Sequence, residues 1–431
     1  MNTNLYNETI GLSYEEAIKE AERCLNCRHK PCVDGCVAHM EIPSMIKAFL
    51  EGRGEEAKQI AESKNSFPEF CGRVCYQDIQ CEAKCVRMKM NAPVKIGLIE
   101  RYIGDHYKSI TEVKPAIDKK IAIIGSGPSG LSCAVTLKQA GFDVTVFEKK
   151  SILGGVLKFG IPPYRLPNNV VDYRIEQLME LGVKFKIEEN FGRTRDYRSL
   201  FEEGFDAMYL AMGASKQNFS KIEGSDHPKV IGWKQFLSIL NIGEDSFHEH
   251  FRHIKRLCVV GGGNVAMDVA ISAAKYGIDT HLVYRRTIDL MPARKAEVEE
   301  CIHLGVNIHE LVDPISVFDF ENDFRVKCKR TKLVKIDEND RGTIIDDEGY
   351  FELDCDLMVM AIGSSVKKLN FEGLALDSQG RIIVDEHFET NIDRVYAAGD
   401  IVSGTKTVIH ALSAGKQAAQ HIIERFNRDN A

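Results

Sequence analysis

Two glycine-rich turns constrain the fold of this chain more than any other feature. The first, Gly125-x-Gly127-x-x-Gly130, follows the apolar run IAII and precedes a helical pattern, LSCAVTLKQAG. The second, Gly261-x-Gly263-x-x-Ala266, lies 136 residues further on and follows LCVV. A strand, a glycine turn and a helix in this order begin a dinucleotide-binding βαβ unit. The sequence therefore predicts an α/β protein with two nested Rossmann-type domains, the second inserted into the first.

The first glycine turn has the features of a flavin-dinucleotide site. Its glycines permit a tight turn and a close approach of backbone N–H groups to pyrophosphate, and the following helix directs its positive end at the phosphates. Glu148 ends the next apolar run, VTVFE, where a carboxylate can accept hydrogen bonds from both ribose hydroxyls. The alternative is an ordinary glycine turn with a surface glutamate. The strand, the helix and the correctly placed acid together argue against that alternative.

A second element of a flavin site follows near the end of the chain, where Gly399-Asp400 comes after RVYAA. In flavoproteins with two dinucleotide domains, a Gly-Asp pair at this point holds the ribityl chain. The helix behind it directs its positive end at the flavin and favours the anionic reduced ring. We predict no catalytic side chain, because hydride transfer takes place at flavin N5 and requires orientation and electrostatics from the protein.

The second glycine turn predicts a preference for NADP(H). The strand that follows its helix, THLVYRR, ends in Arg285 and Arg286 where an NAD site carries an acid. A guanidinium can pair with the 2′-phosphate, which a carboxylate would repel. Arg294 and Lys295 are weaker candidates for the same phosphate. The alternative makes Arg285 and Arg286 a solvated surface pair.

Eight of the thirteen cysteines lie within the first 85 residues. They form two groups: Cys24, Cys27, Cys32 and Cys36, then Cys71, Cys75, Cys81 and Cys85. Zinc sites usually show two C-x-x-C knuckles, and the second group has none. Iron–sulfur clusters accept spacings such as C-x2-C-x4-C and take a remaining ligand from afar. Iron–sulfur clusters are therefore the favoured interpretation, and zinc or buried structural thiols remain as alternatives.

The other five cysteines are single and are predicted to be packing residues: Cys133, Cys258, Cys301, Cys328 and Cys355. The flavin and nicotinamide parts contain no C-x-x-C or C-x4-C pair. The dithiol chemistry of thioredoxin-reductase and glutathione-reductase types is therefore not expected.

Composition and charge narrow the function classes. The formal net charge is −7 and no Lys/Arg-rich run occurs, which argues against nucleic-acid binding. The polar, acidic N-terminus is unlike a secretory signal, and no apolar stretch approaches the ~20 residues of a membrane span. We expect a cytoplasmic protein, in a compartment where clustered cysteines indicate metal or redox chemistry.

The pattern of the chain predicts four segments. Residues 1–115 are expected to be a helical iron–sulfur domain, with two short helices between 44 and 64 separated near Gly52 and Gly54. Residues 116–230 and 376–431 are expected to form the FAD domain, and 231–375 the NAD(P)H domain. A charged linker is predicted over 107–120, an antiparallel pair around a polar turn over 322–349, a strand and a turn over 394–404, and an amphipathic helix over 408–426.

A set of motifs along nearly the whole chain carries a family resemblance. They are CLNCRHKPCVDGC, CGRVCYQDIQCEAKC, PVKIGLIERY, GSGPSG, GGVLKFGIPPYRLP, GGGNVAMD, VYRRTIDLMPARKAEV and AAGDIVSG. In these motifs the chain resembles the small (β) subunit of bacterial NADPH-dependent glutamate synthase and its relatives. The relatives include the NADPH-binding subunit of electron-bifurcating ferredoxin:NADP transhydrogenase, the flavin/iron–sulfur half of dihydropyrimidine dehydrogenase, and sulfide-dehydrogenase-like proteins.

The resemblance implies FAD, NADPH as co-substrate, and two [4Fe–4S] clusters with interlaced ligands. One cluster would use Cys24, Cys27, Cys32 and Cys85; the other would use Cys36, Cys75, Cys81 and Glu100, which leaves Cys71 without a ligand role. Spacing alone would instead suggest two independent four-cysteine sites. The implied cofactor-binding residues are Gly125, Gly127, Pro128, Ser129, Gly130, Glu148, Gly155, Leu157, Arg165, Gly399 and Asp400 for FAD, and Gly261, Gly263, Asn264, Ala266, Arg285 and Arg286 for NADPH.

The function implied is an electron-input subunit. Hydride would pass from NADPH to FAD, and single electrons would pass through the clusters to a larger or second redox subunit. A glutamate synthase large subunit is the first candidate partner. A ferredoxin-linked partner, a pyrimidine-reducing partner and a free-standing NADPH:acceptor oxidoreductase are alternatives. A non-catalytic scaffold or redox sensor is a further alternative, and the intact flavin and nicotinamide motifs argue against it.

Overall fold

The computed structural model describes residues 11–109, 112–192, 195–219, 222–321, 323–335 and 342–429. The chain divides into two compact units. Unit 1 comprises Met1–Lys158, Pro163–Ser215 and Ser365–Ala431, and unit 2 comprises Phe159–Pro162 and Lys216–Ser364. The second unit is thus inserted into the first along the chain. The four-segment division at 115, 230 and 375 remains a prediction.

Unit 1 begins with a helical part. Its elements are α2 (Tyr14–Ala21), α3 (Pro31–Asp34), α4 (Ile42–Leu50), α5 (Gly54–Glu62), α6 (Pro68–Val74), the 3-10 turn η1 (Val86–Lys89) and α7 (Ile96–His106). Proline at the first helical position starts α3 and α6, because its missing N–H would have no partner there. The two predicted short helices are confirmed as α4 and α5. The described part of residues 11–115 contains no strand, as predicted.

The core of this helical part is aliphatic and aromatic. Ile46 and Phe49 of α4 pack with Ile99 and Ile103 of α7 in one buried cluster. Partly buried Cys24, Cys32, Cys36 and Cys85 border the same cluster, and Cys81 lies within it. The cysteine groups are therefore held by a packed helical core.

The rest of unit 1 is a flavin-type module built on a parallel sheet of order β15-β4-β1-β2-β3. Its elements are β1 (Lys120–Ile124), α8 (Pro128–Gln139), β2 (Asp143–Phe147), α9 (Val156–Phe159), α10 (Asn168–Glu180), β3 (Lys184–Lys186), α11 (Ser199–Glu202), β4 (Ala207–Leu210), β15 (Val395–Ala397), α16 (Asp400–Ser403) and α17 (Val408–Asp429). The predicted turn after β15 contains the short helix α16. The predicted helix over 408–426 is α17.

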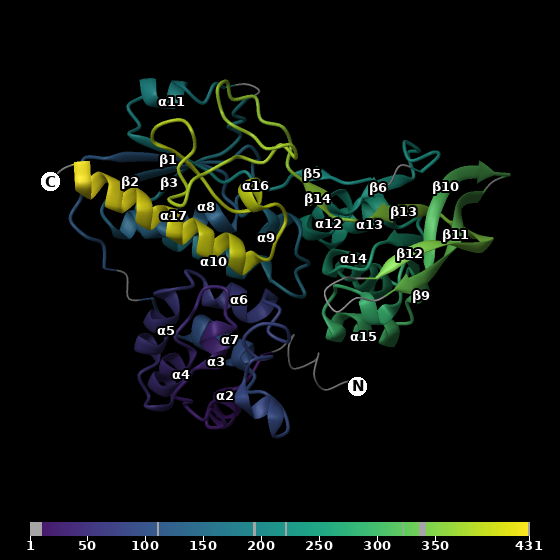
Figure 1. Ribbon diagram of the computed structural model, residues 1–431, viewed down its shortest axis with the longest axis horizontal. Coiled ribbons are helices and arrows are strands. Elements are labelled where there is room, and N and C mark those ends of the chain that lie inside the picture. Colours follow the sequence, from purple (N-terminus) through teal and green to yellow (C-terminus); the bar gives the residue numbers. More distant parts are fainter. Residues whose placement is uncertain are drawn as a thin grey trace. The chain divides into compact units, whose positions relative to one another are not determined.

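The helical part lies against the flavin-type module on the side of α10 and α17 (Figure 1). Arg174 of α10 is central to this contact. Its guanidinium lies 3.0 Å from a carboxylate oxygen of Glu62 and 2.8 Å from one of Glu69, and it donates to the Ser66 carbonyl at 2.9 Å. Lys416 of α17 donates to the Glu62 carbonyl at 2.9 Å. Buried charge thus holds the helical part on the module.

Unit 2 repeats the same sheet plan, in the order β6-β13-β7-β8-β9, with parallel strands. In both sheets the central strand, β1 or β7, leads into a glycine turn and a helix. The elements are β5 (Lys216–Gln217), β6 (Val230–Gly232), α12 (Trp233–Ile242), α13 (Glu244–Phe251), β7 (Arg256–Val260), α14 (Asn264–Lys275), β8 (Asp279–Tyr284), η2 (Ile288–Leu290), α15 (Lys295–His303), β9 (Asn307–Glu310), β13 (Leu357–Met360) and β14 (Ser364–Ser365).

A three-stranded antiparallel sheet extends unit 2. It consists of β10 (Val312–Phe320), β11 (Asp323–Lys335) and β12 (Thr343–Cys355). The predicted antiparallel pair is therefore confirmed, and its predicted turn lies outside the described residues. Cys258, Cys328 and Cys355 share one buried hydrophobic cluster, and Cys133 and Cys301 are also buried, as expected of packing residues. Among the helices that the structure describes, none has the length and apolar character to cross a membrane.

Candidate functional site

A cavity close to the surface of the helical part is lined by Cys24, Cys27, Cys32 and Cys85. We call it the outer cavity. Three of these cysteines come from the first sequence group and one from the second. All four are partly exposed, and the rest of the lining is mainly apolar, including Leu25, Pro31, Ile42, Ile46 and Val86. The outer cavity therefore has four thiols and few other polar groups.

A second cavity, which we call the inner cavity, is lined by Cys36, Cys71, Cys75, Cys81 and Glu100. Its lining also includes Asn65, Gln77, Gln80 and Ile409. Ile409 belongs to α17 of the flavin-type module, so this cavity lies where the helical part meets that module. Cys71, Cys75 and Cys81 are buried.

The linings divide the two cysteine groups in an interlaced way. Cys85 of the second group lies in the outer cavity, and Cys36 of the first group lies in the inner cavity. This division matches the ligand sets that the resemblance implies, and it differs from the two independent four-cysteine sites that spacing alone suggests. Cys71, which has no ligand role in those sets, also lines the inner cavity. The ligand assignment itself remains a prediction.

Glu100 is held inside the inner cavity by one hydrogen bond. It is 5% exposed, and Nδ2 of Asn65 donates to its Oε1 at 2.7 Å. Burial raises the pKa of this carboxyl to about 8, because the charged form loses hydration, and the hydrogen bond from Asn65 acts in the opposite direction. Asn65 also accepts from the Cys71 thiol at 3.5 Å. Asn65 therefore bonds to both Glu100, the predicted ligand, and Cys71, which has no predicted ligand role.

The donor sets fit iron–sulfur clusters better than single metal ions. Within the described part of the chain, no three His, Cys, Asp or Glu side chains converge closely enough to hold one ion. Zinc draws its cysteine sulfurs to about 2.3 Å from one point. A cluster attaches its ligands to different iron atoms and needs them around a wider space. Burial also raises the pKa of Cys32 to about 12 and of Cys36 to about 11, so thiolates there need a positively charged partner.

The first glycine turn is tightly packed at its ends and open in the middle. Gly125 has φ +113°, a backbone conformation that residues with a side chain rarely adopt. A Cβ on Gly130 would lie 1.9 Å from the Gly125 carbonyl oxygen, whereas a Cβ on Gly127 would meet nothing within 4 Å. Pro128 occupies the first position of α8. The open space at the N-terminus of α8 is where the phosphates of a dinucleotide would lie.

Glu148 and Ser126 bind each other beside this turn. β2 ends at Phe147, in register with Ile124 of β1, so Glu148 lies at the same sheet edge as the glycine turn. Ser126 donates to Glu148 from its hydroxyl at 2.7 Å and from its backbone N–H at 3.1 Å. A Cβ on Gly155 would lie 2.8 Å from the Cα of Gly127, so the loop before α9 closes over the turn. These residues form a buried cradle that fits the adenosine end of FAD.

The other candidate FAD residues lie in the same unit. A Cβ added to Gly399 would lie 3.0 Å from the Cβ of Ser129, so Gly399 and Ser129 lie side by side. The Ser129 hydroxyl is 2.6 Å from the Tyr209 hydroxyl. Leu157 is buried in α9, and Arg165 is partly exposed in the segment before α10. Asp400 accepts from the Lys406 backbone N–H at 3.3 Å. Their roles in binding FAD remain predictions.

Asp400 gives a prediction about stability. Burial raises the pKa of its carboxyl from 3.8 to about 6. The unfolded chain then ionises first, so the stability of the flavin-free protein should fall as pH rises from about 4 to about 6. Asp400→Asn should remove this dependence. The free energy of unfolding of Asp400→Asn minus that of wild type should rise by up to about 3 kcal/mol between pH 4 and pH 7. Urea denaturation at the two pH values measures the change, and an equal difference at both would contradict it.

The second glycine turn has the same construction in unit 2. Gly261 has φ +142°. A Cβ added to Gly261 would lie 2.4 Å from the Ala361 carbonyl oxygen. A Cβ added to Gly263, in contrast, would have no atom closer than 4.0 Å. Ala266 occupies the place of the third glycine and is buried. Its Cβ would lie 3.3 Å from a Cβ added to Gly261. The side-chain oxygen of Asn264 accepts from the Arg294 N–H at 2.9 Å. The middle of this turn is also open to a dinucleotide.

The four basic residues near this turn have different surroundings. Arg285 directly follows β8 and its side chain is exposed. Arg286 is half-buried, and its Nε donates to the Gly342 carbonyl at 3.3 Å. Arg294 lies 3.8 Å from Glu297 in a nearly buried ion pair, and Lys295 is exposed at the start of α15. Of the two predicted arginines, Arg285 is the more available to a phosphate.

Some residues around these sites were not predicted from the sequence. Asn65 and Gln77 line the inner cavity, and Ser126 holds Glu148. A single polar residue in a helical stretch has no spacing that distinguishes it from a surface residue. Ser126 had a local signal, because it stands inside the glycine turn and its hydroxyl can cap groups that converge there.

Comparisons with known families match two parts of the chain. A family model described as pyridine nucleotide-disulphide oxidoreductase matches residues 119–415. A model described as dihydropyrimidine dehydrogenase domain II, with a 4Fe-4S cluster, matches residues 2–111. These matches confirm the predicted fold class and the predicted kinds of cofactor, a flavin with a nicotinamide nucleotide and a 4Fe-4S centre. The number of clusters remains a prediction.

Individual proteins are similar over nearly the whole chain. The NADPH-dependent glutamate synthase small chain of Halomonas elongata is 33% identical, with 95% of this chain and 91% of that protein covered. The corresponding Escherichia coli protein is 34% identical with the same coverage. An NAD-dependent dihydropyrimidine dehydrogenase subunit of Escherichia coli O157:H7 is 30% identical, with 94% and 93% covered.

A likeness to solved structures shows the fold. Mycobacterium tuberculosis FprA in complex with NADPH matches with a TM-score of 0.61 at 20% identity, and 74% of this chain and 86% of that chain are covered.

Proposed function

The chain belongs to the small-chain family of NADPH-dependent glutamate synthase and its flavin and iron–sulfur relatives, and we propose that it is an electron-input subunit. It would oxidise NADPH and pass single electrons to a second redox protein. FAD supplies the chemistry that connects the two, because it accepts electrons in pairs and releases them singly. The observation that carries the proposal is the joining of a flavin-type module to two cysteine-lined cavities within one compact unit.

The proposed roles of the chain's own residues follow from their positions. The open glycine turns at Gly127 and Gly263 would admit the dinucleotide phosphates, and Glu148 would hold the ribose of FAD. The inner cavity, which is lined by Ile409 of the module, would receive electrons first. The outer cavity, with its partly exposed cysteines, would deliver them. A general acid or base is not required for this transfer.

The proposed partner is a glutamate synthase large subunit, because the glutamate synthase small chains are among the most similar relatives. The similarity to a dihydropyrimidine dehydrogenase subunit supports a pyrimidine-reducing partner as the second candidate. Anaerobic affinity isolation from the native cells, with identification of the protein that co-purifies, distinguishes the two. None of the thirteen cysteines, all of which lie among the described residues, forms a disulfide, which is consistent with the proposed cytoplasmic location.

The proposed NADPH preference gives a second prediction. Arg285→Ala should raise the KM for NADPH at least about tenfold and leave the KM for NADH nearly unchanged, since a charge-assisted hydrogen bond is worth about 1.5–3 kcal/mol. Arg286→Ala should have the smaller effect, because its guanidinium already bonds to the Gly342 carbonyl. Steady-state rates of ferricyanide reduction with the two nucleotides measure this. An equal rise in KM for both nucleotides would overturn the assignment.

A further inference from the structure

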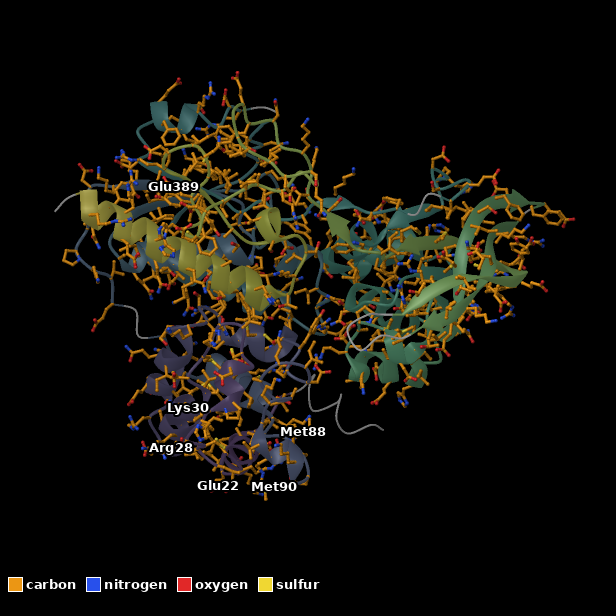
Figure 2. All side chains as sticks on the ribbon, in the orientation of Figure 1. Glu22, Arg28, Lys30, Met88, Met90 and Glu389 are labelled. Carbon is orange, nitrogen blue, oxygen red and sulfur yellow. The ribbon has the colours of Figure 1, made fainter. Side chains whose placement is uncertain are left out.

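The rim of the outer cavity is apolar and exposed. Leu25 is 50% exposed, Met88 47% and Met90 68%, and Val86 is also exposed. Leu25 and Val86 line the cavity itself, one from each cysteine group. Figure 2 shows Arg28 and Lys30 on one side of the helical part and Met88 and Met90 on the other side, all of them away from α17. Met88 and Met90 follow Val86 in the same exposed segment. Exposed methionines and other apolar side chains beside a cavity are typical of a binding surface.

The same region carries positive charge that forms no ion pair with the described residues. Arg28, Lys84 and Lys89 are exposed, and none of them forms an ion pair with another described residue. Between residues 83 and 99 the sequence contains three lysines and one arginine and no acidic residue, although the whole chain has a net charge of −7. Acidic residues in the same part of the chain are Glu41, which pairs with Lys30 at 2.7 Å, the exposed Glu22, and the exposed Asp34, whose neighbour Gly35 lies beside the Lys84 side chain. We call Leu25, Arg28, Lys84, Val86, Met88, Lys89 and Met90 the collar.

The collar lies at the outward end of the proposed electron path. The inner cavity is lined by Ile409 of the flavin-type module, and three of its cysteines are buried. The outer cavity is lined by no residue of that module, and all four of its cysteines are partly exposed. An electron that leaves the flavin therefore reaches the surface beneath the collar.

We infer that the collar is the docking surface for a one-electron acceptor protein whose contact face is acidic. This inference rests on the proposed function, because it assigns the place where electrons leave. The apolar centre would exclude water above the outer cavity, and the surrounding cations would orient an acidic partner and speed its encounter.

The test uses the oxidised holoprotein and an acidic flavodoxin as the probe. In Arg28→Glu/Lys89→Glu, one residue from each cysteine segment changes sign. We expect the Kd for flavodoxin at low salt to rise at least about tenfold. The control, Lys64→Glu/Lys108→Glu, changes the same total charge at exposed sites elsewhere in the helical part and should leave Kd within about twofold of wild type. In about 1 M salt all three proteins should bind equally weakly.

A loss of affinity of equal size in both variants, or no loss in either, would overturn the inference. Basic cytochrome c serves as a second probe and should bind Arg28→Glu/Lys89→Glu at least as well as wild type. Weaker binding of cytochrome c to that variant would also overturn the inference. Binding to the oxidised protein needs no NADPH, so it is measured even if the proposed function fails. That failure would appear separately, as a flavin that NADPH does not bleach.

Discussion

In a Glu100→Ala variant, we expect the purified protein to lose about half of its iron while NADPH still reduces the flavin. Glu100 lines the inner cavity with Cys36, Cys75 and Cys81 and is the predicted fourth ligand there. Alanine removes that ligand without touching the outer cavity or the glycine turns. The cluster in the inner cavity should then be lost or remain incomplete. Iron analysis and electron paramagnetic resonance of the reduced protein measure the effect, and flavin bleaching reports on the unaffected module.

Three further variants make this test specific. Glu100→Gln should retain the cluster with an altered spectrum, because the side-chain amide oxygen remains a possible ligand in the same place. Cys71→Ser changes the other candidate in the same cavity and should leave the iron content unchanged. Asn65→Leu removes the hydrogen bond that orients Glu100 and should change the spectrum of the inner cluster first. Full iron content in Glu100→Ala, or its loss in Cys71→Ser, would show that Cys71 is the ligand.

The second large effect is expected at Arg174. An Arg174→Leu change should destabilise the protein by about 3–5 kcal/mol, because it leaves the carboxylates of Glu62 and Glu69 buried without their partner. The Glu69 carboxylate is almost fully buried, and burial already raises the pKa of this group. The variant should also transfer electrons more slowly from flavin to clusters, since Arg174 holds the helical part on α10.

A surface ion pair provides the control for Arg174. Lys184 and Asp143 lie 2.8 Å apart with largely exposed side chains, and Lys184→Ala should cost at most about 1 kcal/mol. Adding Glu69→Gln to Arg174→Leu should recover part of the loss, because the amide needs no counter-charge. Urea denaturation measures all of these changes. Equal stability of the Arg174 and Lys184 variants would contradict the proposed role of the buried network.

Much of the fold could be predicted because its signals are local. The strands before Gly125 and Gly261, the glycine turns and the helices after them are each contained in a short stretch of sequence, and the sheets follow from their repetition. The cysteine spacing likewise located one redox part within the first 85 residues. Packing single cysteines such as Cys258 could be recognised because they stand alone in apolar runs.

The rest depends on contacts between distant segments. Cys36 lines the inner cavity with cysteines of the second group, and Cys85 lines the outer cavity with cysteines of the first group. Spacing alone suggested two independent four-cysteine sites instead. Asn65 and Arg174 act through partners 35 and 112 residues away, in Glu100 and Glu62. No periodic pattern marks such single polar residues, so the sequence did not identify them.

The most direct test of the account is an anaerobic titration of the purified holoprotein with NADPH, followed by absorbance and by electron paramagnetic resonance, with iron analysis of the same sample. We expect about eight iron atoms per chain, as two [4Fe–4S] clusters require. The flavin should bleach, and paramagnetic reduced-cluster signals should appear when its electrons have passed on. About four iron atoms per chain, or a flavin that stays oxidised under excess NADPH, would contradict the proposal of an NADPH–flavin–two-cluster electron path.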